Sequence, residues 1–262
     1  MIKTRVLTAL ILLPFILGSV YFGGLAFFVP VTIALLIGGW EYFDMVRRAG
    51  YPSFMVVGLA LILAILGDAY LKTNLLQPIL TIGIMATLTL GVLNPEKNWL
   101  VGWALMIGGV LYIGIPGSFF ILIRNLPDIG LAWTVMAMLT VWATDTGAFF
   151  VGTAIGKHGF FTKISPKKTW EGAIGGFVCA TLTMLVLGAF IDLPIIHRIL
   201  FGLGLSVVAT IGDLAESLIK RQTGVKDSSN IIPGHGGLLD RIDSLLFAAA
   251  FAYYYLIWIL RV

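Results

Sequence analysis

Long apolar stretches alternate with short polar segments along almost the whole chain. The apolar stretches end at charged residues, prolines or glycines, and each contains about 18 to 27 residues. Runs of that length are typical of helices that cross a bilayer, whereas the strands of membrane barrels alternate in polarity over about 10 residues. The pattern therefore predicts about nine transmembrane helices, at residues 6–23, 25–43, 54–71, 75–93, 99–123, 130–156, 170–191, 198–220 and 238–260.

The composition supports an integral membrane protein. Of the 262 residues, 59% are hydrophobic and 11% are charged, and the mean hydropathy is +1.00. That much apolar surface excludes an ordinary soluble domain. The net charge of +4 and the lack of a patch that mixes aromatic and basic residues give no indication of nucleic-acid binding. We expect an all-α, polytopic membrane protein that forms a single membrane domain over residues 1–262, with Gly114, Pro116 and Gly117 breaking the fifth helix.

The distribution of basic residues predicts the orientation. A cytoplasmic N-terminus places 13 of the 17 Lys and Arg residues on the cytoplasmic side, as the positive-inside rule requires. The basic N-terminal segment is then a retained first span, because no clear signal-peptide cleavage site follows it. The polar loops 157–169 and 221–237 face the cytoplasm, which predicts a cytoplasm-facing active site. Residues 1–130 look like a scaffold of plain spans, and 131–262 look like the catalytic half.

The eighth predicted helix carries polar residues on one face. Asp213, Glu216, Ser217 and Lys220 lie at positions i, i+3, i+4 and i+7, which places them on the same side of a helix. A carboxylate inside a membrane helix is costly unless it has a partner, so such acids are candidates for function. The structural alternative is a salt bridge between Glu216 and Lys220 that holds two helices together.

Two aspartates begin the ninth predicted helix. Asp240 and Asp243 are three residues apart and share a face. Carboxylates that close repel each other unless a cation lies between them, and oxygen ligands suit a hard ion such as Mg²⁺. Asp213 is a candidate third ligand. The alternative is ordinary capping of a helix N-terminus, although Arg241 between the two acids makes capping alone a weaker explanation.

The segment before that helix, Pro-Gly-His-Gly-Gly-Leu-Leu, is rich in glycine. Gly236 and Gly237 allow a ligand to approach the backbone closely, and the free amides at a helix start form an anion site. Lys220, Arg221 and Lys226 lie nearby in sequence and can neutralise phosphate oxygens. His235 has two open interpretations: contact with a phosphate or acid–base chemistry, or a backbone hydrogen bond that holds the loop.

The other long polar loop is lysine-rich. Ser165, Lys167 and Lys168 precede a helix start within the sequence SPKKTWEG. A basic loop of this kind often sets topology or contacts anionic lipid, but the turn and the helix start favour a second phosphate-binding element. Asp145 in the sixth predicted helix is another candidate buried acid, for which an interhelical hydrogen bond is the structural alternative.

Together these features point to phosphoryl or nucleotidyl transfer onto a lipid at the membrane face. At this level of detail the chain resembles the phosphatidate cytidylyltransferases, also called CDP-diacylglycerol synthases. The family pattern is matched without departure by Ser-Leu-Ile-Lys-Arg at 217–221, Lys-Asp at 226–227, Ser229, Pro233, His-Gly-Gly at 235–237 and Asp-Arg-Ile-Asp at 240–243. The segments SPKKTWEG and GDLAES also look like that family. The N-terminal half resembles it only as hydrophobic spans.

The resemblance implies that CTP and phosphatidate give CDP-diacylglycerol and pyrophosphate. It also implies Mg²⁺, a second cation such as K⁺, a homodimer and a bacterial inner membrane. The expected metal ligands are Asp213, Asp240 and Asp243. The expected catalytic residues are Asp213, Lys220, Arg221, Lys226, Asp227, His235, Asp240 and Asp243. The expected substrate-binding residues are Ser165, Lys167, Lys168, Lys220, Arg221, Gly236, Gly237 and Arg241.

Three other classes of protein fit the sequence less well. A secondary transporter for an anionic solute would place charges near the midplane of the membrane, whereas the charges here gather near one face. A CDP-alcohol phosphotransferase would need a compact Asp-Gly-x-x-Ala-Arg motif, which the sequence lacks. A purely structural membrane protein would have no reason for the dense charge of residues 217–243.

Overall fold

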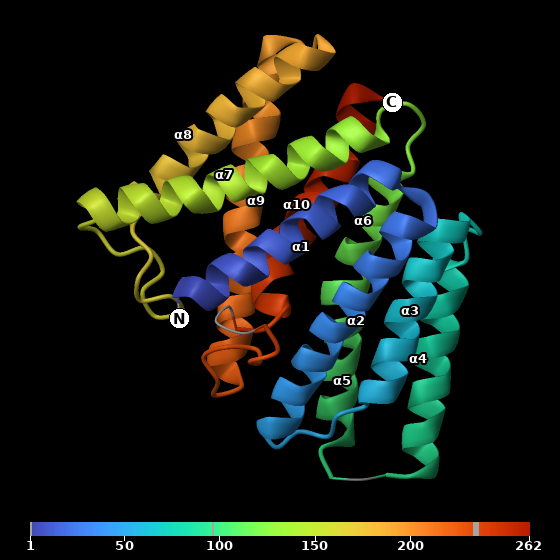
Figure 1. Ribbon diagram of the computed structural model, residues 1–262. Coiled ribbons are helices and arrows are strands. Elements are labelled where there is room, and N and C mark those ends of the chain that lie inside the picture. The colour runs from blue at the N-terminus through green and yellow to red at the C-terminus, as the bar shows by residue number, and fades with distance from the viewer. Residues whose placement is uncertain (1, 96, 233–235) are drawn as a thin grey trace. The chain divides into compact units, whose positions relative to one another are not determined.

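Helices joined by loops make up most of the part of the chain that the structure describes (Figure 1). This computed structural model describes the backbone of residues 2–95, 97–232 and 236–262, and within these ranges the side chains of residue 10 and of residues from 12 onward. The helical elements are α1 (Ile2–Phe22), α2 (Gly24–Arg48), α3 (Met55–Leu71), α4 (Leu76–Leu93), α5 (Trp99–Gly109), η1 (Val110–Gly114), α6 (Ile115–Arg124), α7 (Gly130–Ile155), α8 (Trp170–Leu187), η2 (Gly188–Ile191), α9 (Ile195–Gln222), α10 (Leu239–Tyr254) and η3 (Tyr255–Leu260).

Every predicted apolar run coincides with a helix or with a continuous helical run. Within the described ranges there is no β-strand, and seven helical runs are long and apolar enough to cross a membrane. Two shorter apolar helices, Leu12–Phe22 within α1 and Met55–Leu71, accompany them. The all-α membrane fold is therefore confirmed, whereas nine complete spans remain a prediction.

The fifth predicted helix continues through its glycine- and proline-rich part. A π-helical turn, η1, joins α5 to α6, and Pro116 lies in the first turn of α6. A proline inside a continuous helix removes one backbone hydrogen bond, and the π-helical turn just before it lies where that regular pattern is interrupted. The expected break is thus a local change of helical pitch, a common way for a helix to absorb irregular residues.

The chain divides into two compact units. The first comprises residues 1–125 and 222–242, and the second comprises 126–221 and 243–262. In the first unit α3 packs against α2, α4 and the run from α5 to α6. Gly58 on α3 leaves room for the ring of Phe43 on α2, because a Cβ at position 58 would collide with that ring. The core of this unit includes the fully buried side chains of Phe43, Ile62 and Met106.

The second unit depends on close packing of small residues. Gly147 on α7 lies against Cys179 and Gly175 on α8, and Gly176 lies against the backbone of Thr144. Small residues let helix backbones approach closely, which is a common basis of association between membrane helices. α9 adds Phe201, whose ring centroid lies 5.1 Å from that of Trp133 on α7. The α7–α8 pair thereby supports the loop that joins these two helices.

Thr169 stabilises the start of α8. Its Oγ1 accepts a hydrogen bond from the backbone N–H of Gly172 at 3.1 Å, and its own backbone is extended, as at an N-cap position. We expect Thr169→Ala to destabilise the protein by about 1 kcal/mol, since one orphan amide loses its acceptor. Thermal unfolding in detergent measures the loss, and Thr169→Ser, which keeps the hydroxyl, is the matched control. Equal midpoints for Thr169→Ala and the wild type would contradict the capping role.

Candidate functional site

The lysine-rich loop of the second unit is folded back onto α8 and α9. Phe160 is buried with Ala173 and Leu214, and Ile164 packs against the same cluster. The backbone N–H of Phe160 donates to the carbonyl of Lys168 at 2.8 Å. Buried Phe160 and its backbone hydrogen bond to Lys168 therefore hold the lysine-rich loop in place.

This loop brings Lys168 to α9. The Nζ of Lys168 lies 2.7 Å from Oδ2 of Asp213, with the two side chains 23% and 34% exposed. The Oγ of Ser217 lies 3.4 Å from the other oxygen of Asp213. Lys167 is exposed, and the carbonyl of Ser165 accepts from the N–H of Lys168 at 3.2 Å. Of the three loop residues predicted to bind substrate, Lys168 contacts a predicted metal ligand.

Asp243 joins the same group of charges. It is 7% exposed, and its carboxylate interacts electrostatically with Asp213, Lys220 and Asp145. The N–H of Ser244 donates to its Oδ1 at 2.6 Å. The second unit thus brings two predicted metal ligands together with Lys168 and Lys220. Asp145 is exposed, so the prediction that it is buried was wrong: α7 turns this residue away from the packed α8 face.

Two further contacts position the basic end of α9. Lys220 forms an ion pair with Glu216, which is completely buried. The Nε of Arg221 donates to the carbonyl of Ile164 at 3.2 Å, which ties α9 to the lysine-rich loop. The Glu216–Lys220 salt bridge, which was the structural alternative to a functional role, is present. It forms within α9 and not between two helices.

In the first unit, Asp240 organises the glycine-rich loop. Its Oδ2 accepts from the N–H of Ser228 at 3.1 Å and from the N–H of Gly237 at 2.9 Å. Gly236 has a φ of +84°, a conformation that favours glycine. Its carbonyl accepts from Ile232 at 3.0 Å. Asp240 therefore has a capping role in this unit, which the sequence offered as the alternative to metal binding.

Glu41, on α2, is the residue that the sequence analysis missed. Its side chain is 0% exposed, and it accepts hydrogen bonds from the amides of Leu238 at 2.9 Å and Leu239 at 2.6 Å. These are the amides that were expected to form a free anion site at the start of α10. The anion that they bind in the structure is the protein's own carboxylate, and the substrate-binding roles of Gly236 and Gly237 stay predictions. A signal was present, since Glu41 is an acid inside an apolar run.

The remaining predicted residues that the structure describes lie in the loop and at the start of α10. Lys226, Asp227 and Arg241 are exposed, and His235 lies outside the described residues. Within the described ranges, no group of three or more Asp, Glu, His or Cys residues comes close enough to hold a metal ion. The expected three-aspartate metal site therefore stays a prediction.

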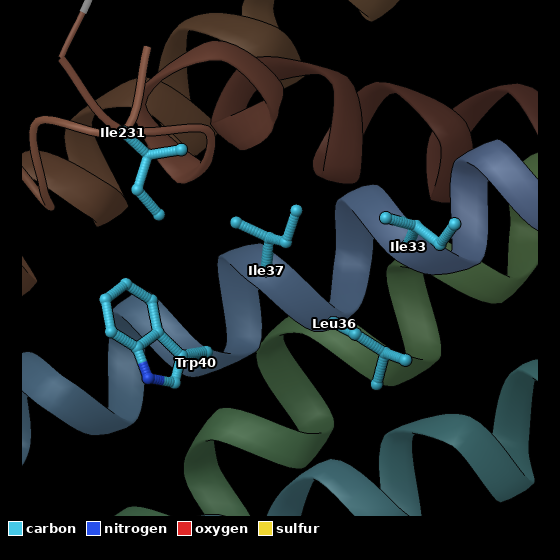
Figure 2. A pocket seen from close by; sticks show the side chains of 5 residues that line it. All are labelled: Ile33, Leu36, Ile37, Trp40 and Ile231. Carbon is cyan, nitrogen blue, oxygen red and sulfur yellow. The ribbon is translucent and has the colours of Figure 1, made fainter.

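In the first unit, an apolar groove lies beside the loop that precedes α10. It is lined by Ile33, Leu36, Ile37 and Trp40 of α2 and by Ile231 of the loop. Figure 2 shows Ile231 extending from the loop towards Ile37 and Trp40. The lining is almost entirely hydrocarbon, so this face of α2 suits contact with lipid chains better than contact with water.

Comparison with known proteins shows similarity over most of the chain. The sequence matches the cytidylyltransferase family over residues 3–259. A phosphatidate cytidylyltransferase of Bacillus subtilis is 48% identical over 148 residues, which cover 56% of this chain and 55% of the relative. Proteins of the same name from Staphylococcus aureus (strain COL) and Staphylococcus epidermidis are 37% and 36% identical over 94% of this chain and 95% of their own lengths. The match runs from α1 to η3 and includes both loops, and the chain belongs to the cytidylyltransferase family.

Proposed function

We propose that this protein transfers the cytidylyl group of CTP to phosphatidate, giving CDP-diacylglycerol and pyrophosphate. The names of its bacterial relatives support this activity. The structural observation that carries the proposal is the meeting of Asp213 and Asp243 with Lys168 and Lys220 in the second unit. Nucleotidyl transfer needs acidic side chains that can hold a divalent cation and, beside them, Lys or Arg side chains that can bind phosphate.

The proposed reaction is an in-line displacement. An oxygen of the phosphatidate phosphate attacks the α-phosphorus of CTP, a new P–O bond forms, and the bond to the β-phosphate breaks to release pyrophosphate. The attacking oxygen is already ionised at neutral pH, so little general-base help is needed. Lys168, Lys220 and Arg221 would bind the phosphates, since Lys168 pairs with Asp213, Lys220 interacts with Asp243 and Arg221 is tied to the lysine-rich loop.

Mg²⁺ is the proposed metal. Asp213 and Asp243 would hold it in the second unit, and Asp240 is the third ligand expected from the sequence. Mg²⁺ is commonly bound by one or two carboxylates together with substrate phosphates, a donor set that two acidic side chains can begin. When bound, the ion would offset the charge of the reacting phosphates. A second cation such as K⁺ at the same acids is part of this proposal.

We also propose a location and an assembly. The excess of basic residues on one side supports a cytoplasmic N-terminus. Relatives from bacteria and seven membrane-length helical runs within the described ranges support a bacterial inner membrane. A homodimer rests on the family resemblance alone, and size-exclusion chromatography with light scattering in detergent would test it.

Metal removal tests the function directly. With purified protein in detergent, radiolabelled CTP, phosphatidate and Mg²⁺, we expect label to enter a chloroform-soluble product. EDTA should reduce this product to background, because the reacting phosphates lose their counter-charge, and added Mg²⁺ should restore it.

The nucleotide is the control in this assay. ATP, GTP and UTP should give much less lipid product than CTP at the same concentration. A folded protein that gives no lipid product with any of the four nucleotides would contradict the proposal and favour a transporter or another lipid acceptor.

A further inference from the structure

Glu41 forms an unusually complete set of hydrogen bonds for a buried acid. Oε1 accepts from the N–H of Leu238 at 2.9 Å and from the hydroxyl of Ser229 at 2.5 Å. Oε2 accepts from the N–H of Leu239 at 2.6 Å and lies 3.1 Å from the hydroxyl of Ser228. Each carboxylate oxygen therefore has two partners, all from the polar loop and the start of α10.

The partners explain how a buried charge is tolerated at this place. Burying a carboxylate is costly unless it is hydrogen-bonded or paired, and within the described residues Glu41 has no ion pair. The positive end of the α10 dipole and four charge-assisted contacts offset that cost. Serine or aspartate residues close in sequence commonly cap the start of a helix. Glu41 is 197 residues away from Leu238, so its hydrogen bonds also tie the start of α10 to α2.

The contacts continue from Glu41 to Asp240. The Oγ of Ser228 lies 3.1 Å from Oε2 of Glu41 and 3.0 Å from Oδ2 of Asp240, so this hydroxyl lies between the two carboxylates and its one proton can be donated to either. The N–H of Ser228 also donates to Asp240. Gly237 completes the arrangement, since a Cβ at that position would collide with Ser228 and Glu41. The orientation of Asp240 in the first unit therefore depends on a serine that Glu41 holds.

We infer that Glu41 is a positioning residue that fixes the polar loop and, through Ser228, the carboxylate of Asp240 for the transfer reaction. This inference rests on the proposed function, because Asp240 is assigned there as a metal ligand. Glu41 itself touches neither CTP nor lipid. Its part is to hold the loop and Asp240 in one arrangement before the substrates arrive, so that binding them costs less ordering.

Glu41→Gln is the decisive variant, since it keeps the size of the side chain and removes its charge. Its amide group must face one of the two backbone donors, so at least one hydrogen bond at the start of α10 is replaced by repulsion. We expect kcat/KM to fall about 10- to 100-fold, as outer partners of functional ligands typically show. We also expect faster hydrogen exchange at the amides of Leu238 and Leu239 in the substrate-free protein.

Asp44→Asn is the matched control for the loss of a buried acid. Asp44 lies on the same helix and is 2% exposed, but it pairs with Arg47 and Arg48, each at 2.5 Å, and with no residue of the loop that the structure describes. This variant should keep wild-type exchange at Leu238 and Leu239 and wild-type kcat/KM per folded molecule. Ser229→Ala should change both quantities in the same direction as Glu41→Gln but less, and combining the two should give less than the product of their effects.

Two results would overturn the inference. One is wild-type exchange together with wild-type kcat/KM in Glu41→Gln. The other is an equal loss of kcat/KM in Glu41→Gln and Asp44→Asn, which would mean that general destabilisation explains both. A wild-type protein that makes no lipid product would refute the proposed function instead, and unchanged exchange in Glu41→Gln would then separately refute the anchoring of the loop.

Discussion

Asp243→Asn is expected to abolish cytidylyl transfer while the protein stays folded. Asp243 is buried and interacts with Asp213, Lys220 and Asp145. Asparagine at this position removes the negative charge and keeps the size of the side chain. Losing a carboxylate that holds a catalytic cation forfeits several kcal/mol of transition-state stabilisation, or about 1,000-fold or more in kcat. Folding should be preserved, since asparagine has the same shape and still accepts the hydrogen bond from the N–H of Ser244.

The measurement combines turnover with stability. Lipid product is assayed with radiolabelled CTP, and the unfolding midpoint is measured in the same detergent. Asp192→Asn is the control, because Asp192 is exposed and its φ of +51° is one that asparagine adopts readily. A folded Asp243→Asn protein with wild-type turnover would refute the metal assignment of this residue.

Lys220→Met is expected to have the largest effect on stability. Lys220 pairs with Glu216, which is completely buried on the same helix. Removing one partner of a buried ion pair typically costs about 3–5 kcal/mol, because the other charge stays in a low-dielectric environment. Activity should also fall, since Lys220 interacts with Asp243 and is proposed to bind phosphate.

A double variant separates these two consequences. Glu216→Gln together with Lys220→Met removes both charges, and replacing a whole buried pair by groups of similar volume is often close to neutral. We expect the double variant to regain most of the wild-type unfolding midpoint and to remain inactive. Recovery of turnover along with stability would show that Lys220 acts on folding alone, and an unchanged midpoint in Lys220→Met would contradict the importance of the pair.

Sequence-based prediction of the site was most accurate where the contacts are local. Spacing of four residues offered the pairing of Glu216 with Lys220 as the structural alternative, and helix α9 makes that pair. Spacing could not indicate that Lys168 reaches Asp213, since the folding of the loop against Phe160 and Leu214 decides this contact. It also could not give the exposure of Asp145, which depends on the face of α7 that packs on α8.

The sequence alone establishes that this protein is an all-α membrane protein, because long apolar runs in a bilayer must satisfy their backbone hydrogen bonds internally. It also determined the family, through motifs that are contiguous in the chain. Which anion lies at the start of α10 is known only from the folded structure. Periodicity describes neighbours along one helix, whereas the contact between Glu41 and Leu239 spans 198 residues and exists only after α2 and the loop pack together.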